Sequence, residues 1–294
     1  MITILDGSIG QEIVTRAPGE PTPLWGLEVM MSAPAIVREI HDDYFAAGAD
    51  IATTNTYNAL RDRLANNGVE DRFEGLHATA CELAVAARDA AGRGKVAGSL
   101  GPLGASYRPD LVPPASEAAP LYAEIAKLQA PYVDLFICET MSSVEQARGA
   151  LMGAQTVGKP VWLAISVSDE DGTRLRSGEP VEDILPVVAE LKPDALLVNC
   201  SLPEAVTAAL PLLSGVSCPL GAYANGFTGI TDAFKEDNPT VAVLKARTDL
   251  GPAEYAAFAQ QWVDLGATII GGCCEVGPAH IAALRDKFSI EGTN

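Results

Sequence analysis

Short apolar runs alternate with longer amphipathic segments along most of this chain. Each run is rich in Val, Ile, Leu and Ala and ends at polar or glycine positions, which is the pattern of a buried β-strand. Eight such runs are predicted as strands, at residues 2–6, 50–55, 95–100, 133–139, 160–167, 194–200, 219–224 and 267–272.

Helical patterns occupy most of the intervals between these runs. Pro34 opens one helix, in which Ile36, Val37, Ile40 and Phe45 are spaced to share one face. Further helices are predicted at residues 76–91, 143–157, 181–191, 203–213, 252–265 and 278–288. Gly48, Gly92, Gly158 and Gly266 fall where helices are expected to end.

About eight strands with intervening helices over 294 residues predict an α/β fold, a single-domain (β/α)₈ TIM barrel covering residues 1–294. A doubly wound open sheet is the alternative. It fits less well because the glycines after the first run, in Asp6-Gly7-Ser8-Ile9-Gly10, follow an acid that would repel a phosphate. Residues 103–120, rich in proline and small side chains, are expected to form a long loop over the barrel mouth.

Charge and composition narrow the class of partner. The formal net charge of −18 argues against nucleic acid or an anionic membrane as a partner. The first residues lack the basic region of a signal peptide, and no apolar run is long enough for a membrane-spanning helix. Six cysteines without a secretory signal are typical of a reducing compartment, so we expect a cytoplasmic protein.

Two of the predicted strands end on cysteine. Val198-Asn199 leads into Cys200, and Ile269-Ile270-Gly271-Gly272 leads into Cys273 and Cys274. Because parallel strands place their carboxyl ends at one rim, three thiols there could bind a zinc ion and leave one position open for a substrate. The alternative is that all three are small buried apolar residues. A disulfide between the adjacent cysteines is disfavoured by ring strain.

The other strand ends are also polar. They carry Asp6, Thr54, Asn55, Ser99, Glu139, Thr140, Tyr223 and Asn225. Asp6 and Glu139 could accept hydrogen bonds from a substrate ammonium group, as an amino acid ligand would require. Alternatively, Asp6 caps the following helix and Glu139 pairs with a structural cation. Strand alternation points Cys138 away from the side that Glu139 faces.

Together these motifs resemble the zinc-dependent homocysteine S-methyltransferases, the group that includes S-methylmethionine- and betaine-dependent enzymes and the homocysteine module of cobalamin-dependent methionine synthase. The motifs occur in family order over nearly the whole chain. They are residues 5–10 (LDGSIG), 49–57 (ADIATTNTY), 98–102 (GSLGP), 139–140 (ET), 199–200 (NC), 271–274 (GGCC) and 278–281 (PAHI).

The resemblance implies a (β/α)₈ barrel with Zn²⁺ held by Cys200, Cys273 and Cys274. It also implies that Asp6 and Glu139 hold the homocysteine amino group, with backbone amides around Gly7 and Ser99 near the substrate. Asn55, at another strand end, is a further candidate for substrate binding. Two positions depart from the family pattern: Glu275 stands where glycine is usual, and Ala224 where proline is common. These departures bear on the methyl donor more than on the thiol acceptor.

The reaction so implied is transfer of a methyl group from a small onium donor (S-methylmethionine, S-adenosylmethionine or betaine) to homocysteine, giving methionine. A cationic donor favours aromatic surroundings, for which Trp25, Tyr57 and Tyr107 are candidates. Trp25 is expected in a loop between the first strand and its next helix, facing the mouth. Two alternatives stay open: a methyl acceptor for a corrinoid protein acting in trans, and a non-catalytic zinc- or thiol-binding barrel.

Overall fold

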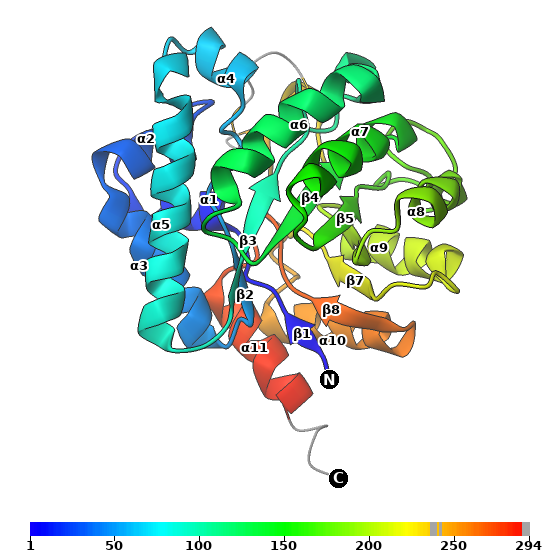
Figure 1. Ribbon diagram of the computed structural model, residues 1–294. Helices are drawn as coiled ribbons and strands as arrows, with labels where there is room; N and C mark the ends of the chain where they lie inside the picture. Colours follow the sequence, from blue (N-terminus) through cyan, green and yellow to red (C-terminus); the bar gives the residue numbers. More distant parts are fainter. Residues whose placement is uncertain (236–239, 241–242, 290–294) are drawn as a thin grey trace.

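The computed structural model describes residues 1–235, 240 and 243–289. Within them, eight parallel strands form one sheet in the order β1-β8-β7-β6-β5-β4-β3-β2. The strands are β1 (Thr3–Ile4), β2 (Ile51–Thr53), β3 (Lys95–Leu100), β4 (Leu135–Met141), β5 (Val161–Ile165), β6 (Ala195–Asn199), β7 (Leu220–Tyr223) and β8 (Ala267–Ile270). All eight predicted strands are confirmed, and helices surround them (Figure 1).

The ring closes between β1 and β2. A single parallel bridge joins Leu5 to Ile51. Two backbone hydrogen bonds reinforce it, from Asp50 N–H to the Ile4 carbonyl (2.7 Å) and from Asp6 N–H to the Ile51 carbonyl (2.9 Å). Side chains add to this seam, since Asp50 accepts from Ile4 N–H at 2.9 Å. The predicted TIM barrel is therefore correct, with a seam that depends partly on carboxylates.

The helices follow the predicted pattern with four additions. The α-helices are α1 (Ile9–Arg16), α2 (Trp25–Ser32), α3 (Pro34–Ala47), α4 (Arg61–Asn66), α5 (Phe73–Ala91), α6 (Ala115–Gln129), α7 (Val144–Ala154), α8 (Leu185–Leu191), α9 (Pro203–Ala209), α10 (Pro252–Asp264) and α11 (Pro278–Ser289). Short 3₁₀ turns are η1 (Glu70–Arg72), η2 (Pro109–Leu111), η3 (Gln155–Val157), η4 (Val181–Ile184), η5 (Leu210–Leu213) and η6 (Asp232–Lys235). Sequence patterns did not predict α1, α2, α4 and α6. The four glycines expected at helix ends all adopt left-handed backbone angles there.

The loop expected over residues 103–120 is wrong at its end, because α6 already begins at Ala115 and contains Pro120. Packing explains why a helix forms despite the proline. A Cβ atom on Gly149 of α7 would lie 2.8 Å from the Ala118 Cβ, and one on Gly153 would lie 2.4 Å from the Ala119 carbonyl oxygen. The two helices therefore approach closely, and this contact stabilises α6 beyond its local propensity.

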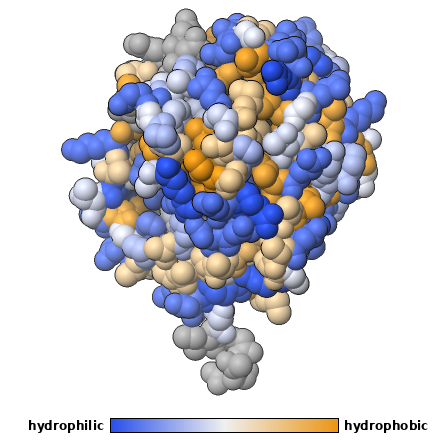
Figure 2. Space-filling view, turned by 90° about the vertical axis from the view of Figure 1, so that its left-hand side faces the viewer, coloured by the Kyte–Doolittle hydropathy of each residue, from blue (hydrophilic) through white to orange (hydrophobic). Residues whose placement is uncertain are grey.

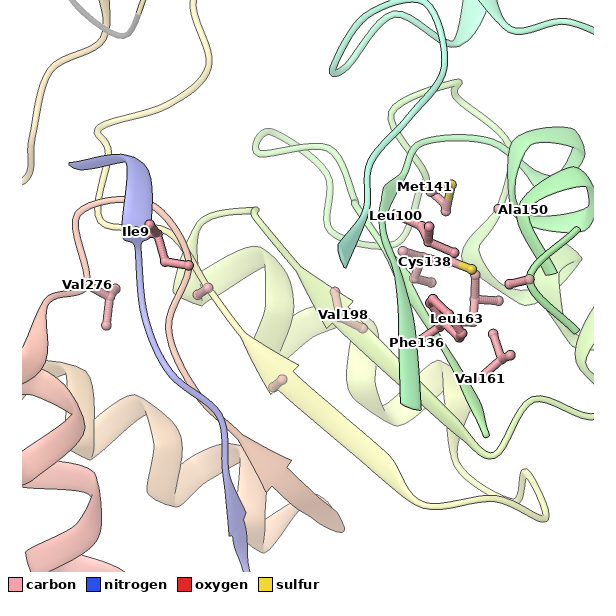
Figure 3. Close-up of a cluster of buried hydrophobic side chains, with 14 of the residues drawn as sticks. Ile9, Leu100, Phe136, Cys138, Met141, Ala150, Val161, Leu163, Val198 and Val276 are labelled. Atoms are coloured by element: carbon pink, nitrogen blue, oxygen red, sulfur yellow. The ribbon is translucent and has the colours of Figure 1, made fainter. Parts of the chain in front are cut away.

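The strands divide the core into two layers. Alternate residues of β4 illustrate the division: Leu135 and Ile137 pack inside the barrel, while Phe136 and Cys138 pack outside it against the helices. Figure 3 shows Phe136, Cys138 and Leu163 together, with Ala150 of α7 beyond them. Cys138 thus points away from the barrel interior, as strand alternation predicted.

The molecular surface over α2, α3 and α5 carries both hydrophobic and hydrophilic residues. Hydrophobic residues on this face lie in patches bordered by hydrophilic ones (Figure 2). In the part of the chain that the structure describes, no helix is both long and apolar enough to cross a bilayer.

One buried polar residue affects stability. His41 of α3 is fully buried, and neither ring nitrogen has a hydrogen-bond partner among the described residues. Burial, with the nearby Arg38 charge, lowers the pKa of His41 to about 4. His77 is also buried but is satisfied, by the Ala59 carbonyl at 2.9 Å and Gln129 at 3.2 Å.

We expect His41 to destabilise the fold as the pH falls. Its folded pKa lies below the unfolded value of about 6.5, so protonation favours the unfolded chain below that pH. Lowering the pH from 8 to 5.5 should therefore remove about 1.4 kcal/mol of stability in the wild type that His41→Leu does not lose. Urea unfolding of both proteins at the two pH values measures this difference. Parallel losses in both would contradict the assignment.

Candidate metal and substrate site

Three cysteines converge at the carboxyl end of the barrel. Cys200 follows β6, and its N–H donates to the Tyr223 carbonyl at 3.1 Å. Cys273 and Cys274 follow β8. Cys273 N–H donates to the Ala224 carbonyl at 2.9 Å, and the Cys274 carbonyl accepts from Gly226 N–H at 2.8 Å. The end of β7 thus connects both cysteine segments through backbone hydrogen bonds.

The sulfur atoms are close enough to share one ion. The Cys200 Sγ lies 2.7 Å from that of Cys273 and 3.9 Å from that of Cys274. All three lie within 4.8 Å of one another, and no disulfide joins them. Tetrahedral zinc with three thiolates separates its sulfurs by about 3.8 Å. The donor set therefore fits a metal of this type, with Cys200 and Cys273 moving apart by about 1 Å to accommodate it.

Cys200 is the most constrained of the three. Its backbone is left-handed, with φ of 48°. Its carbonyl accepts from Arg176 Nη2 at 3.0 Å, and its sulfur lies 2.9 Å from the Tyr107 hydroxyl. Hydrogen bonds from the two neighbouring thiols lower the pKa of Cys200, which makes this sulfur the favoured first thiolate.

Asp6 lies at the end of the first strand and is 2% exposed. It accepts from Thr53 N–H at 2.7 Å and from the Thr53 hydroxyl at 3.1 Å. Burial raises the pKa of Asp6 well above its usual value, against the Thr53 hydrogen bonds, and the negative charge of Glu139 raises it further. Asp6 does not cap α1, because Ser8 is the capping residue and accepts from Gln11 N–H at 3.2 Å.

Glu139 projects into the barrel from β4. Ser99 Oγ donates to one carboxylate oxygen at 2.5 Å, and the Tyr223 hydroxyl donates to the other at 3.0 Å. Burial raises the pKa of Glu139 to about 7, partly offset by these two hydrogen bonds. Glu139 has no cationic partner among the described ion pairs, so the alternative of a structural cation is not supported there.

Gly7 and Gly272 lie where the loop after β1 packs against the loop after β8. A Cβ on Gly7 would lie 2.0 Å from the Val276 carbonyl oxygen, and one on Gly272 would lie 2.1 Å from Val276 Cγ1. Only glycine fits at either position, because the backbone of the cysteine loop lies directly against that of the first loop.

Asn55 contacts the residue that follows Trp25. Asn55 Nδ2 donates to the Gly26 carbonyl at 2.9 Å, which ties the end of β2 to the start of α2. The loop expected around Trp25 is wrong, since Trp25 is the first residue of α2. Its indole nitrogen is buried without a hydrogen-bond partner among the described residues. Two helices, α1 and α2, lie between β1 and α3. Helix α2 packs against the core through its buried residues Leu27, Val29 and Met30.

A cavity of about 540 Å³ lies on the other side of Tyr107 and Arg176 from the cysteines, none of which lines it. Tyr107 and Arg176 belong to its wall and also contact Cys200, so the cavity adjoins the cluster. Ser168, Glu170 and Lys235 are among its other lining residues. Volumes of this order accommodate small metabolites and cofactors.

Several residues that support the site were not predicted. Arg176 and its buried partner Asp169 lie in the segment after β5, which no motif marked. Thr53 is the last residue of β2, but only Thr54 and Asn55 were expected at this strand end. Asn199 was recognised as part of a motif, but its contacts reach Thr140 across the sheet: Oδ1 accepts from Thr140 N–H and Nδ2 donates to the Thr140 hydroxyl, each at 3.0 Å.

The two departures from the family pattern lie at the rim. Ala224 is buried, and its carbonyl accepts from Cys273 N–H and from the Tyr255 hydroxyl at 3.1 Å. Glu275 adopts a left-handed φ of 63° and accepts a hydrogen bond from the Gln11 amide. A glycine at 275 would adopt this conformation without strain, so the Gln11 contact holds a less favoured residue in place.

Comparison with known proteins decides the family. The profile described as Homocysteine S-methyltransferase matches residues 3–288. The chain belongs to the homocysteine S-methyltransferase family. It is therefore an enzyme, a methyltransferase acting on the homocysteine thiol.

Individual homocysteine S-methyltransferases are similar to this chain over nearly their full lengths. The Escherichia coli K12 enzyme is 31% identical, with 97% of this chain and 95% of that protein covered. Homocysteine S-methyltransferase YbgG of Bacillus subtilis is 27% identical, with 96% and 93% covered. The metallated crystal form of E. coli MmuM superimposes with a TM-score of 0.81 at 29% identity, covering 97% of this chain and 96% of the other. The three-cysteine cluster and this metallated relative together indicate a metal site.

We expect Asn199 to hold Thr140, and with it the strand end that carries Glu139. Asn199→Ala leaves a buried Thr140 N–H without its acceptor, which should cost about 1–3 kcal/mol in the free energy of unfolding. Thr140→Ala keeps the hydrogen bond from Thr140 N–H and loses only the one that the hydroxyl accepts from Asn199 Nδ2, so its free energy of unfolding should fall by less. Urea unfolding of the two variants compares them, and equal losses would contradict a specific role for the amide.

Proposed function

We propose that Cys200, Cys273 and Cys274 bind one zinc ion, and that the enzyme transfers a methyl group from a small onium donor to the thiol of homocysteine, giving methionine. The observation that carries the proposal is the convergence of three sulfurs within 4.8 Å at the carboxyl end of the barrel. Three protein ligands leave a fourth tetrahedral position for a substrate sulfur, as in catalytic zinc sites.

The proposed role of the metal is to lower the pKa of the substrate thiol. A free thiol has a pKa of about 8.5, so little of it is thiolate at neutral pH. When bound, zinc would lower that pKa and keep the sulfur deprotonated and reactive. All other contributions in this proposal come from the side chains that bind and orient the two substrates.

Asp6 and Glu139 are proposed to hold the ammonium group of homocysteine. Burial raises the pKa of both carboxyl groups. An ammonium cation between them would favour their charged forms and offset the cost of burying negative charge. Ser99 and Tyr223 already fix both oxygens of Glu139, so the carboxylate presents its remaining lone pairs in a defined direction. Gly7 and Asn55 complete the proposed substrate surroundings.

The methyl donor is proposed to enter from the mouth of the barrel, near the 540 Å³ cavity whose wall residues Tyr107 and Arg176 also contact Cys200. S-methylmethionine, S-adenosylmethionine and betaine each carry a methyl group on a cationic centre, which aromatic faces and negative charge attract. Tyr107 lines this cavity, and Trp25 and Tyr57 are the further aromatic candidates. Transfer requires only that the donor methyl lie in line with the acceptor sulfur, so positioning is the main contribution of the protein.

We expect Cys273→Ser to abolish stoichiometric zinc binding, because it removes one of three thiolate ligands. Metal analysis of the purified protein measures the zinc content. Cys218→Ser is the matched control, since Cys218 is a half-buried free thiol outside the cluster and should leave zinc content unchanged. Full zinc occupancy with full activity in Cys273→Ser would rule out the proposed ligand set.

We expect Glu139→Gln to lower kcat/KM for homocysteine while zinc content stays intact. Replacing a charged acceptor by a neutral one should cost about 1–3 kcal/mol, roughly 5- to 150-fold. The pKa of Glu139, raised to about 7, adds a pH signature. Wild-type kcat/KM should rise as the pH increases through 7, because the free carboxyl must lose its proton to accept from an ammonium. The variant should lack this rise. Identical pH profiles would show that Glu139 does not contact the substrate.

Methionine formation from homocysteine with a panel of donors tests the donor class. Activity with a free onium compound supports the proposal, whereas activity only with a methylated corrinoid protein favours a partner in trans. No activity with any of these donors would contradict the proposed donor class. Within an active panel, Trp25→Ala should raise the donor KM several-fold more than the homocysteine KM. Equal effects on both would exclude Trp25 from the donor site.

A further inference from the structure

The left-handed backbone of Cys200 needs support from its neighbours. A non-glycine residue at a φ of 48° has a strained backbone. Contacts hold the residue at three points: its N–H on Tyr223, its carbonyl on Arg176 and its sulfur on Tyr107. Two of these three contacts come from Tyr107 and Arg176, residues outside the proposed ligand set.

The sulfur contact has a defined direction in the metal-bound protein. The Tyr107 hydroxyl lies 2.9 Å from the Cys200 sulfur, and either atom could donate when the cysteine is a thiol. A metal-ligating cysteine is a thiolate with no proton to give. Tyr107 must then be the donor, and the hydrogen bond is charge-assisted.

Arg176 holds the tyrosine ring in place. Its guanidinium lies 4.4 Å from the centre of the Tyr107 ring, and its side chain is only 8% exposed. Nε donates to Ser166 Oγ at 2.7 Å, and Nη2 donates to Asp169 at 3.1 Å as well as to the Cys200 carbonyl. Stacking and the fork of hydrogen bonds use the planar geometry that lysine lacks.

Asp169 connects this arrangement to two further loops. One of its oxygens accepts from Leu202 N–H at 3.0 Å, next to the Cys200 segment, and the other accepts from Ile230 N–H at 3.1 Å, in the segment after β7. The buried Arg176–Asp169 pair therefore makes many hydrogen bonds and fixes the loops that surround one sulfur atom. Such a pair is expensive to bury unless its geometry is well satisfied, as it is here.

We propose that Tyr107 and Arg176 are positioning residues for the proposed metal site: Tyr107 donates a hydrogen bond to the Cys200 thiolate, and Arg176 fixes both the Tyr107 ring and the Cys200 carbonyl. The inference rests on the proposed role of Cys200 as a metal ligand. The hydrogen bond withdraws electron density from the sulfur, so a bound metal keeps more of its capacity to polarise a substrate thiol. The same contact orients the thiolate toward Cys273 and Cys274.

The test uses Tyr107→Phe, which keeps the ring under Arg176 and removes only the hydroxyl. Zinc affinity is measured by competition with a chromogenic chelator, and the sulfur-to-metal charge-transfer band is recorded for the Co²⁺-substituted protein without substrates. We expect zinc affinity to fall by about 10- to 100-fold, because the contact favours the thiolate form of Cys200 and holds its orientation. The band should move to longer wavelength, because a thiolate without its hydrogen bond gives up an electron more easily.

Tyr122→Phe is the matched control. Tyr122 is also a buried tyrosine, on α6, and its hydroxyl donates to the Gly101 carbonyl, just after β3, at 3.1 Å and has no cysteine partner among the described hydrogen bonds. This variant should leave the Co²⁺ spectrum and zinc affinity unchanged. Arg176→Lys keeps a charge for Asp169 but not the stacked plane, and should shift the band in the same direction as Tyr107→Phe.

Unchanged affinity and spectrum in folded Tyr107→Phe, checked by near-ultraviolet circular dichroism, would overturn the inference. If Tyr107→Phe fails to fold, an unshifted band in Arg176→Lys overturns it instead. The measurements need no methyl donor or homocysteine, so they separate this inference from the proposed reaction. Wild-type protein that binds neither metal would instead disprove the metal site itself.

Discussion

Parallel pairing of all eight strands in one ring is the constraint on which this molecule depends. Because every strand runs in the same direction, the residues that follow each one meet at a single rim. Cys200 and Cys273 are separated by 73 residues in the chain, yet their sulfurs lie 2.7 Å apart because β6, β7 and β8 are consecutive in the sheet. The backbone of β7 links both segments, so the thiols are brought together by the sheet itself.

The rim also buries negative charge, which is costly without compensation. Asp6 is compensated by Thr53, and Glu139 by Ser99 and Tyr223, but these neutral donors leave both carboxyl groups with raised pKa values. The interior thus holds two carboxyl groups and three thiols, while Arg176, which contacts the Cys200 carbonyl, is already paired with Asp169. Such an environment favours binding of positively charged ligands, whether a metal ion or an ammonium group, because a cation would stabilise the deprotonated carboxyl and thiol groups.

The sequence was sufficient for the strands and for the strand-end residues, because apolar runs ending on polar residues have a short, regular pattern. It was insufficient where packing outweighs local signals. Helix α6 contains Pro120 and forms because Gly149 and Gly153 let α7 approach it, a fact that involves residues about thirty positions away. Trp25 begins a helix whose length is too short for periodicity to indicate it. Arg176 and Asp169 carry no motif, and only the folded loops show that they surround Cys200.

The seam between β1 and β2 gives Asp6 two roles. Backbone pairing there is limited to one bridge, and the Asp6 carboxylate supplements it by accepting from Thr53 N–H on the opposite strand. The group that completes the ring is therefore also one that faces the rim. Protonation of Asp6, or a new hydrogen-bond donor to its oxygens, would weaken the hydrogen bond to Thr53 and so the pairing between β1 and β2. Occupancy of the rim and closure of the barrel are thus thermodynamically linked through one side chain.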